Sequence, residues 1–493
     1  MTPSKTERSV ETYPFGQLNR RPVVADFSSG QLSSDGGLLL IAAVDRTYRI
    51  SEQFAACFSD QQDPNRIQHQ LKDLIAQRLY GLVQGYEDLN DHDQLRHDPL
   101  FGIALGKLES DQARCAPLAG KSTLNRLEQS MHVASDLETA RYVKFTLNPE
   151  AIEQLWVQLF INQTQNPPRQ IILDLDVTDD PVHGSQEQAA FNGYYKHECY
   201  TPLLIYCGRH LLAAQLRPAN VAPAAGALEQ LQRIIAQIRS QWTEVVILVR
   251  GDSAYSRDDI MTWCESQVKV QYVLAHASNP RLRQLTAGLE ERAQLAYQQH
   301  RQQVAMTLEP LVPPVLNTEL DALVPPQVFY QSLDYRTLGS WSCSRRLVCK
   351  LTYGAQGVHR HFVVTSYSAA QIPPGKLHED YYCPRGEMEN RIKEHQLDLF
   401  SDRTSTHEFE SNQLRLWSSS LAYVLMQALR QHLLVGTELA NAQCGTIRLN
   451  LLKVGAQVRF SVRRIVIALS SHWARRSLFD QVYRRLQQLP RPG

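Results

Sequence analysis

Residues 171–177 read Ile-Ile-Leu-Asp-Leu-Asp-Val, an apolar run that contains two acidic residues, Asp174 and Asp176. Such a run between polar segments is typical of a buried strand. Alternation with a period of two places both carboxylates on one face of that strand. Because a buried carboxylate without a partner costs several kcal/mol, we expect a compensating group beside them, and a divalent cation would serve.

The segments that follow alternate between strand and helix patterns. Runs at 200–207 and 210–216 predict a hairpin, and an amphipathic helix covers about 228–238. Residues 245–249 form another buried-strand pattern, which Arg-Gly and Asp252 close. Antiparallel strands, a crossover helix and further strand and helix units predict a mixed α/β sheet.

The texture of the chain divides its 493 residues into several structural regions, as expected for this length. Helical periodicity dominates the N-terminal part, and short β runs separated by Pro and Gly interrupt the α/β core. We predict a helical N-terminal region (1–165), the first part of the core (166–282), a β-rich insertion (283–378), the second part of the core (379–434) and a basic helical C-terminal region (435–493).

Composition excludes several classes of protein. Hydrophobic residues make up 43% and charged residues 20%, which argues against global disorder. No apolar run approaches the roughly 20 residues that a membrane helix needs, and the N-terminus lacks the apolar core of a signal peptide. The nine cysteines are scattered rather than closely paired. We expect a cytoplasmic protein with reduced thiols.

Charge is segregated although the net charge is only +1. Beyond Arg448 the basic residues face a single acidic residue, Asp480. They are Lys453, Arg459, Arg463, Arg464, Arg475, Arg476, Arg484, Arg485 and Arg491. A basic tail of this kind suits a polyanion, and a solvated helix face remains the alternative.

A third acidic candidate lies in Tyr-Tyr-Cys-Pro-Arg-Gly-Glu-Met-Glu-Asn-Arg-Ile-Lys-Glu, residues 381–394. If a helix begins near Pro384, four polar residues share one of its faces. They are Arg385, Glu389, Lys393 and Gln396. The alternative is an exposed helix with paired charges. Carboxylates are the ligands that magnesium prefers.

Four segments resemble the insertion sequence 1380 family of transposases: ILDLDVTDDPVHG (172–184), FNGYY (191–195), VRGDSAYSRDDI (249–260) and YYCPRGEMENRIKEHQLDLFSDRTSTH (381–407). The resemblance covers roughly Val23 to Arg475. It implies a DDE transposase with an RNase H-like catalytic core and a β-rich insertion before the catalytic Glu.

The resemblance also implies which residues act. Asp176, Asp252 and Glu389 match the three catalytic carboxylates, which hold two Mg²⁺ (or Mn²⁺) ions, and Asp174 is the main rival for the first position. The ions would activate water and then a DNA 3′-hydroxyl for attack on phosphodiesters.

Other residues are implied as DNA or phosphate contacts. Tyr382, Arg385 and Glu389 match the first three members of the Tyr-Arg-Glu-Lys signature of the related insertion sequence 4 group. Its Lys would fall on Gln396, and Lys393 on the same face is a substitute.

In the insertion, Trp341, Arg345 and Arg346 form a group in which the Trp ring could stack on a flipped base. A structural aromatic at a strand edge is the favoured alternative.

The predicted function is therefore DNA transposition by strand cleavage and strand transfer. Expected partners are double-stranded DNA, both terminal inverted repeats and target, and a second copy of the chain, with the helical N-terminal region in DNA binding and dimerisation. No membrane is involved; the setting is bacterial cytoplasm, at the nucleoid when DNA is bound. Alternatives are an RNase H-like nuclease or resolvase without strand transfer, a domesticated non-catalytic DNA-binding protein, and, more remotely, a small-substrate phosphoesterase.

Overall fold

The computed structural model describes residues 13–18, 20–107, 117–130, 144–164, 166–308 and 317–490. The chain forms two compact units. Unit 1 comprises Met1–Pro149, Glu394–Ser401 and Trp417–Gly493, and unit 2 comprises Glu150–Lys393 and Asp402–Leu416. Within the described residues, no helix is both long and apolar enough to cross a membrane.

An eight-stranded mixed sheet forms the centre of unit 2, in the order β11-β10-β6-β12-β13-β16-β15-β14. Its strands are β6 (Gln170–Val177), β10 (Leu203–Cys207), β11 (His210–Gln215), β12 (Val246–Gly251), β13 (Val270–His276), β14 (Gln327–Tyr335), β15 (Arg345–Gly354) and β16 (Gly357–Thr365). Strand β12 runs parallel to β6 and β13, and the remaining pairs are antiparallel. The predicted mixed α/β sheet is confirmed.

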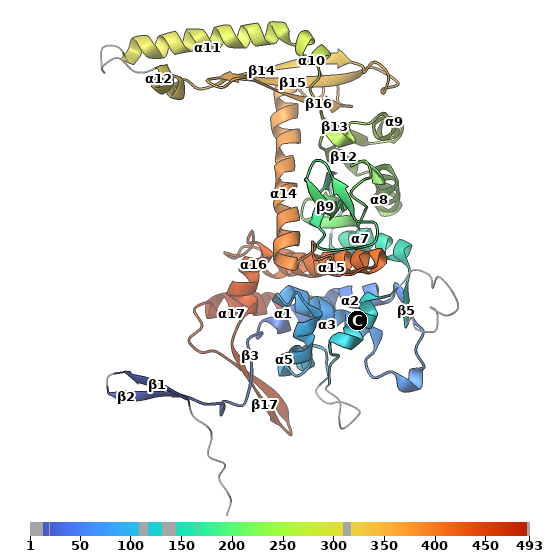
Figure 1. The fold of residues 1–493 in the computed structure, drawn as a ribbon, viewed down its shortest axis with the longest axis vertical. Helices are drawn as coiled ribbons and strands as arrows, with labels where there is room; N and C mark the ends of the chain where they lie inside the picture. The colour runs from blue at the N-terminus through green and yellow to red at the C-terminus, as the bar shows by residue number, and fades with distance from the viewer. Residues whose placement is uncertain are drawn as a thin grey trace, which may run out of the picture. The chain divides into compact units, whose positions relative to one another are not determined.

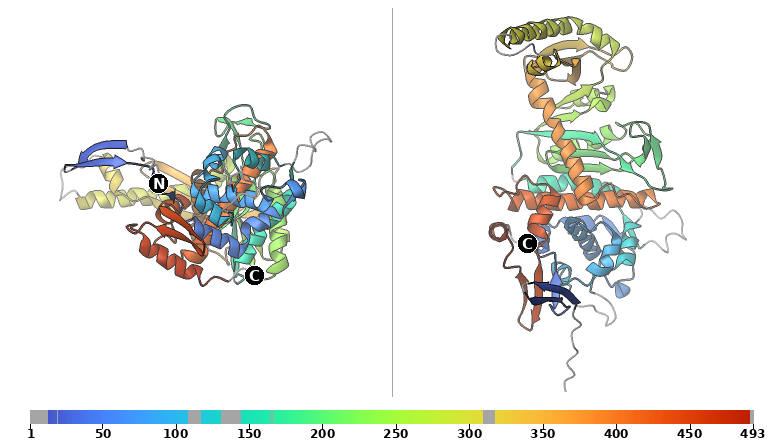
Figure 2. Two further views of the ribbon diagram at one scale, coloured as in Figure 1. Left: turned by 90° about the horizontal axis from the view of Figure 1, so that it is seen from below. Right: turned by 60° about the vertical axis from the view of Figure 1, so that its left-hand side comes forward.

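Helices cover both faces of this sheet (Figures 1 and 2). One face of β6, with Ile171, Leu173 and Leu175, belongs to the main hydrophobic core, which includes residues of α8 (Ala227–Gln241) and α9 (Asp258–Ser266). The opposite face carries a smaller cluster in which strand residues meet the helical segment after β16. This cluster contains Leu248, Val273, Val348, Val363, Ile372 and Leu377, with Ile172, Tyr367, Tyr381 and Tyr382 packed against it.

That helical segment begins at Pro374, well before Pro384, where the sequence predicts a helix start. It consists of α13 (Pro374–Lys376), a π turn η5 (Leu377–Tyr382), a 3₁₀ turn η6 (Cys383–Arg385), α14 (Gly386–Lys393) and a second π turn η7 (Glu394–Asp398). Pro384 lacks an N–H and therefore cannot make the regular α-helical bond. The chain tightens there into a 3₁₀ turn instead of starting a new helix.

The region between β13 and β16 extends the sheet. The β runs expected from the sequence lie in β14, β15 and β16, which pair antiparallel with one another. Three helices precede them: α10 (Pro280–Leu285), α11 (Ala287–Leu308) and α12 (Asn317–Leu323). The long α11, which the sequence analysis did not predict, contacts β14 and β15 (Figure 1).

Smaller elements complete unit 2. They are α7 (Pro149–Gln163), the sheet β7-β9-β8 (Asp180–Pro181, His197–Tyr200 and Ala190–Asn192) and the turn η4 (Ser253–Tyr255), while α15 (Phe409–Leu433) begins in unit 2 and continues into unit 1.

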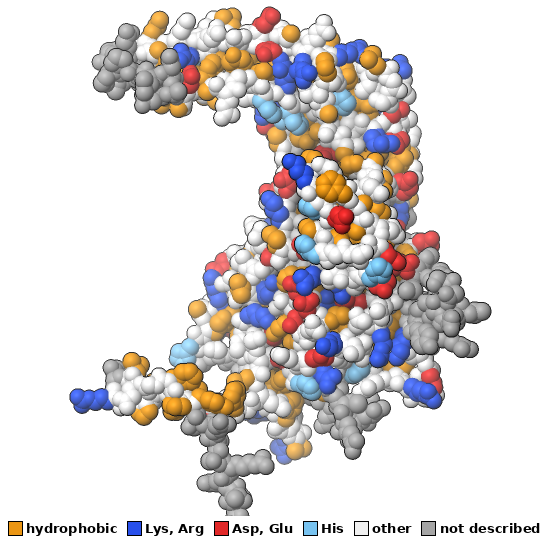
Figure 3. Space-filling model, in the orientation of Figure 1, with side chains coloured by type: hydrophobic (Ala, Val, Ile, Leu, Met, Phe, Trp, Pro, Cys, Tyr) orange, Lys and Arg blue, Asp and Glu red, His pale blue; other side chains and the backbone are white. Residues whose placement is uncertain are grey.

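Unit 1 is mostly helical, with short strands. Its N-terminal helices are α1 (Leu38–Tyr48), α2 (Ile50–Ala55), α3 (Leu71–Gln84), α4 (His92–Leu95), α5 (Pro99–Ala104) and α6 (Lys121–Glu128), with the 3₁₀ turns η1 (Pro64–Arg66) and η2 (Leu89–Asp91). Its strands there are β1 (Tyr13–Leu18), β2 (Arg21–Ala25), β3 (Gln31–Ser33), β4 (Phe58–Asp60) and β5 (Phe145–Leu147). Hydrophobic side chains gather on the exposed β1–β2 hairpin (Figure 3).

The C-terminal region is not wholly helical, and this part of the prediction is wrong. Besides α16 (Cys444–Ile447), η8 (Arg448–Leu452) and α17 (Arg476–Leu486), it forms the hairpin β17 (Ala456–Ser461) and β18 (Arg464–Leu469). The hairpin pairs with β3 at the other end of the chain. Its alternating apolar residues are interleaved with arginines, which hid the strand pattern in the sequence.

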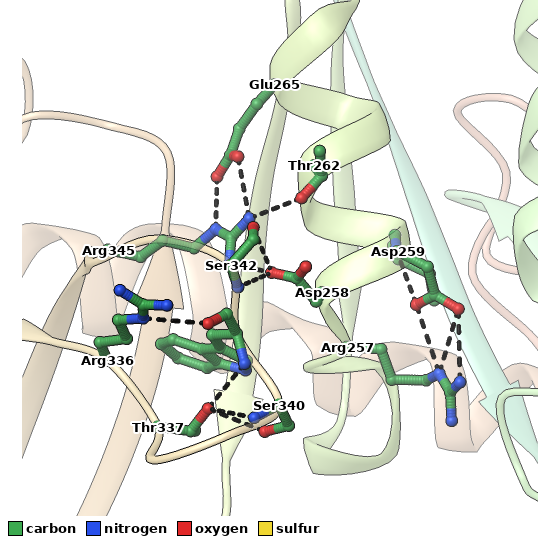
Figure 4. A network of polar contacts seen from close by, with 12 residues as sticks. Arg257, Asp258, Asp259, Thr262, Glu265, Arg336, Thr337, Ser340, Ser342 and Arg345 are labelled. Atoms are coloured by element: carbon green, nitrogen blue, oxygen red, sulfur yellow. Dashed lines mark hydrogen bonds and ion pairs between the residues drawn. The ribbon is translucent and has the colours of Figure 1, made fainter.

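A buried arginine ties β15 to α9 (Figure 4). Arg345, whose side chain is 3% exposed, pairs with Asp258 and Glu265, each at 2.6 Å. Its guanidinium also donates to the Thr262 hydroxyl at 2.8 Å. These acidic partners raise the pKa of Arg345 against the opposing effect of burial.

We predict that Arg345→Met lowers the free energy of unfolding by about 3 kcal/mol, because two acidic partners lose their counter-charge in a mostly buried site. Arg257→Met is the matched control, since Arg257 and Asp259 form a pair at the start of the same helix with both side chains about half exposed, worth less than about 1 kcal/mol. Urea unfolding followed by circular dichroism measures both losses. Equal losses would show that the Arg345 network does not stabilise the insertion.

Candidate active site

Two acidic residues lie at one edge of the sheet, where the parallel strands β6 and β12 end. Gly251 is opposite Leu175, so Asp176 and Asp252 each come next along their strands. Carboxyl ends of adjacent parallel strands meet at the same edge, which is where open α/β sheets bind ligands.

Asp174 is neutralised inside the sheet. Arg250 lies opposite it on β12 and donates two hydrogen bonds to its carboxylate, from Nε at 2.5 Å and from Nη2 at 2.8 Å. Both side chains are buried, and Nη1 of Arg250 donates to the backbone oxygen of Tyr381. The group that compensates Asp174 is therefore an arginine of the neighbouring strand, which leaves Asp176 as the carboxylate of this face that is open to further ligands.

Asp176 is only partly compensated. Its Oδ1 accepts from the backbone N–H of Val177 at 2.9 Å, and its Oδ2 accepts from Nη2 of Arg385 at 2.7 Å. Burial raises the pKa of Asp176 to about 6. Arg385 opposes this rise, and the charges of Asp252 and Glu389 add to it. The three carboxylates predicted from the sequence therefore lie close enough to act on one another electrostatically.

The turn after β12 holds Asp252 in place. Its Oδ1 accepts from the N–H of Ala254 at 2.9 Å and caps η4. A Cβ at position 251 would lie 2.8 Å from the ring of Tyr255, so this close turn requires glycine. Among the described residues the buried Tyr255 hydroxyl has no hydrogen-bond partner, and burial together with Asp176 and Asp252 raises its pKa strongly.

Arg385 connects the sheet to α14. Its Nη1 lies 3.7 Å from Oε1 of Glu389, one helical turn further on, as the predicted shared face requires. Its Nε is buried and makes no hydrogen bond within the part of the chain that the structure describes. Glu389 is 58% exposed, whereas Tyr382 is half-buried, with its ring centroid 4.9 Å from that of His361. Burial raises the pKa of Tyr382, and the charges of Asp252 and Asp176 add to that rise.

The remaining predicted contacts fall outside this group. Lys393 is exposed at the end of α14, and Gln396 lies half-buried in η7, which belongs to unit 1. Trp341 is 3% exposed and packs edge-on against Tyr335, so a flipped base cannot stack on its ring in this structure. Arg345 serves the α9 network described above.

Arg346 is likewise used within the fold. It donates to the backbone oxygens of Tyr367 and Ile372 at 3.0 and 2.9 Å, and more weakly to the Ser332 hydroxyl. Its guanidinium thus fastens the chain after β16 to β15.

The charge balance of the site fits divalent cations. Arg385 offsets one of the charges of Asp176, Asp252 and Glu389, which leaves an excess of two negative charges. All three groups offer the oxygen donors that Mg²⁺ and Mn²⁺ accept. The pKa of Asp176 is raised mainly by burial, and Arg385 offsets only part of that rise.

Sequence reasoning missed two residues of this site. Arg250 carried a signal, because an arginine within an apolar strand pattern demands a buried acidic partner. Tyr255 carried none, since an aromatic residue three positions after an acidic residue is common in turns that close a core.

Comparison with known proteins gives two findings. A family model described as "Transposase DDE domain group 1" matches residues 15–491, nearly the whole chain. Among solved structures, a similar one is the cryo-EM structure of a piggyBac transposase synaptic complex with hairpin DNA. It is 9% identical with a TM-score of 0.37, and the match covers 85% of this chain and 80% of that chain. No curated protein matches the sequence.

Proposed function

The chain belongs to the DDE transposases, and on that premise we propose that it cleaves and joins DNA at the ends of an insertion sequence, with Asp176, Asp252 and Glu389 as catalytic carboxylates. The observation that supports the proposal is that Asp176 and Asp252 follow adjacent parallel strands, while Arg385 bonds Asp176 at 2.7 Å and lies 3.7 Å from Glu389.

We place the chain in the insertion sequence 1380 family and assign the core an RNase H-like fold. The four segments that resemble the family support this assignment. The sheet supports it as well, because an antiparallel hairpin precedes a crossover helix and two parallel strands. The domain roles inferred from the sequence, with residues 1–165 in DNA binding and dimerisation, remain part of the proposal.

The carboxylates fit two magnesium or manganese ions. When bound, such ions would lower the pKa of the attacking oxygen and neutralise the charge that develops on the leaving oxygen. Asp176, Asp252 and Glu389 would hold these ions through their carboxylate oxygens. The protein contributes position and charge rather than covalent chemistry.

Arg385 has two roles in this scheme. With the site free of metal, its guanidinium holds Asp176 and prevents full repulsion among the carboxylates. Its Nη1 lies 3.7 Å from Oε1 of Glu389, which is longer than a hydrogen bond, so this nitrogen can donate to a further acceptor. Arg385 is therefore placed to bind a phosphate oxygen beside Asp176, with Tyr382 next to it and exposed Lys393 as a further cation on the DNA path.

The C-terminal hairpin is the part of the basic region best placed to bind DNA. Lys453, Arg475 and Arg485 are used internally, by Asp35, Glu438 and backbone oxygens of Leu433 and Val435. The exposed basic residues of the hairpin are Arg459, Arg463 and Arg464, and those of α17 are Arg476 and Arg484. Arg491 lies outside the described residues.

A nuclease or resolvase that cuts without strand transfer is the second candidate, because the same carboxylates would serve both reactions. Joining of a cleaved end to target DNA separates the two. Since transposition needs two ends, we expect a homodimer on DNA.

We predict that Arg385→Ala lowers the rate of DNA end cleavage by at least about tenfold, the effect of about 1.4 kcal/mol in the transition state. Arg391→Ala is the matched control: Arg391 is on the same helix but pairs with Glu387 and lies away from the carboxylates. Cleavage of a labelled terminal-repeat duplex in Mg²⁺ measures both rates. Equal rates for the two variants would contradict the proposed position of the active site.

We also predict that replacing both Arg463 and Arg464 by alanine reduces the slope of log affinity against log salt by about 1.8, since each lost phosphate contact removes about 0.9. Arg475→Ala should leave the slope unchanged, because that guanidinium already pairs with Glu438. Fluorescence anisotropy with duplex DNA at several salt concentrations measures the slopes. An unchanged slope in the double variant would exclude the hairpin from DNA binding.

A further inference from the structure

A cluster of metal-ligating side chains lies in the helical segment just before Arg385. His378 and Glu379 come from η5, and Cys383 comes from the following 3₁₀ turn. One ligand atom from each of these three residues lies within 4.8 Å of the others. They share no residue with the carboxylate site.

The sulfur distances match a tetrahedral zinc site. Cys383 Sγ lies 3.4 Å from Nδ1 of His378 and 3.6 Å from Oε2 of Glu379. Zinc bonds of about 2.3 Å to sulfur and about 2.0 to 2.1 Å to nitrogen or oxygen place such ligand atoms about 3.5 Å apart at tetrahedral angles. The sulfur is therefore already at the spacing from each of its two partners that one zinc ion would impose.

The surroundings prepare His378 for coordination through Nδ1. Its Nε2 lies 2.9 Å from Nδ1 of His361 on β16, and its Nδ1 lies 3.2 Å from Oε1 of Glu379. In the tautomer with the proton on Nε2, that proton makes a hydrogen bond to His361 and the lone pair of Nδ1 is available to an ion. Metal-bound histidines usually donate their second N–H in this way.

Two hydrogen bonds hold Glu379 in place. Its Oε1 accepts from Lys350 at 2.8 Å and from Tyr330 at 2.5 Å. Oε2 is the oxygen that faces Cys383. The carboxylate can therefore keep both neighbours and still offer one oxygen to an ion.

We propose that His378, Glu379 and Cys383 bind one zinc ion, with water in the fourth position, and that this ion fixes the segment preceding the catalytic residues. Nitrogen and sulfur ligands select zinc over magnesium, which accepts oxygen. Binding releases the Cys383 thiol proton to solvent. The ion would hold the π turn to the sequence that carries Tyr382 and Arg385, and so position both side chains.

Metal analysis of the full-length purified chain tests the site. After incubation with zinc and gel filtration, wild type should retain about one zinc ion per chain, the content of a single structural site. Cys383→Ser should lose it. Cys343→Ser is the matched control, because Cys343 is also exposed and lies outside the cluster, and it should retain the ion.

Cobalt substitution supplies a readout independent of activity. Wild type, Cys343→Ser and Asp252→Asn loaded with Co²⁺ should show a thiolate-to-cobalt charge-transfer band, and Cys383→Ser should not. Circular dichroism verifies that each variant is folded. Retention of the band by Asp252→Asn would show that the cobalt ion bound to sulfur does not depend on the carboxylate site. Equal zinc content in wild type and Cys383→Ser, or no thiolate band in wild type, would overturn the proposal.

Discussion

The interaction on which the site depends is the ion pair between Asp176 and Arg385. It joins the edge of the central sheet to the helical segment that packs on its face, with 2.7 Å between Oδ2 and Nη2. Burial raises the pKa of Asp176 to about 6, Arg385 offsets only part of that rise, and the charges of Asp252 and Glu389 add to it. In the proposed site, a bound cation would relieve the repulsion that remains among the three carboxylates.

The two acidic residues on the same face of β6 have different surroundings. Asp174 lies one step deeper, where β12 still runs alongside and presents Arg250. Asp176 lies beyond the last residue of β12, and its neighbour on β10 is the apolar Leu204, so neither strand places a cation opposite it. In the proposed site, the end of β12 at Gly251 therefore leaves Asp176 rather than Asp174 for a ligand.

Much of the core could be predicted from sequence because its signals are local. The alternation at 171–177, the hairpin before α8 and the spacing of Arg385 and Glu389 depend on residues close together in the chain. The Arg250–Asp174 pair, the burial of Trp341 and the pairing of β17 with β3 depend on residues far apart. The predicted helix start at Pro384 was wrong because proline is compatible both with a first helical turn and with a 3₁₀ turn inside a longer helical segment.

The most direct test is the effect of Mg²⁺ on stability at pH 7.5, where Asp176 is ionised. Magnesium at about 100 times its dissociation constant should stabilise wild type by about 2.7 kcal/mol. Asp252→Asn should melt no lower than wild type without metal, because it removes one repelling charge, and should lose most of the magnesium response. Asp259→Asn, an exposed aspartate of α9, should keep it. A full magnesium shift in Asp252→Asn, together with a lower metal-free melting temperature, would contradict the proposed active site.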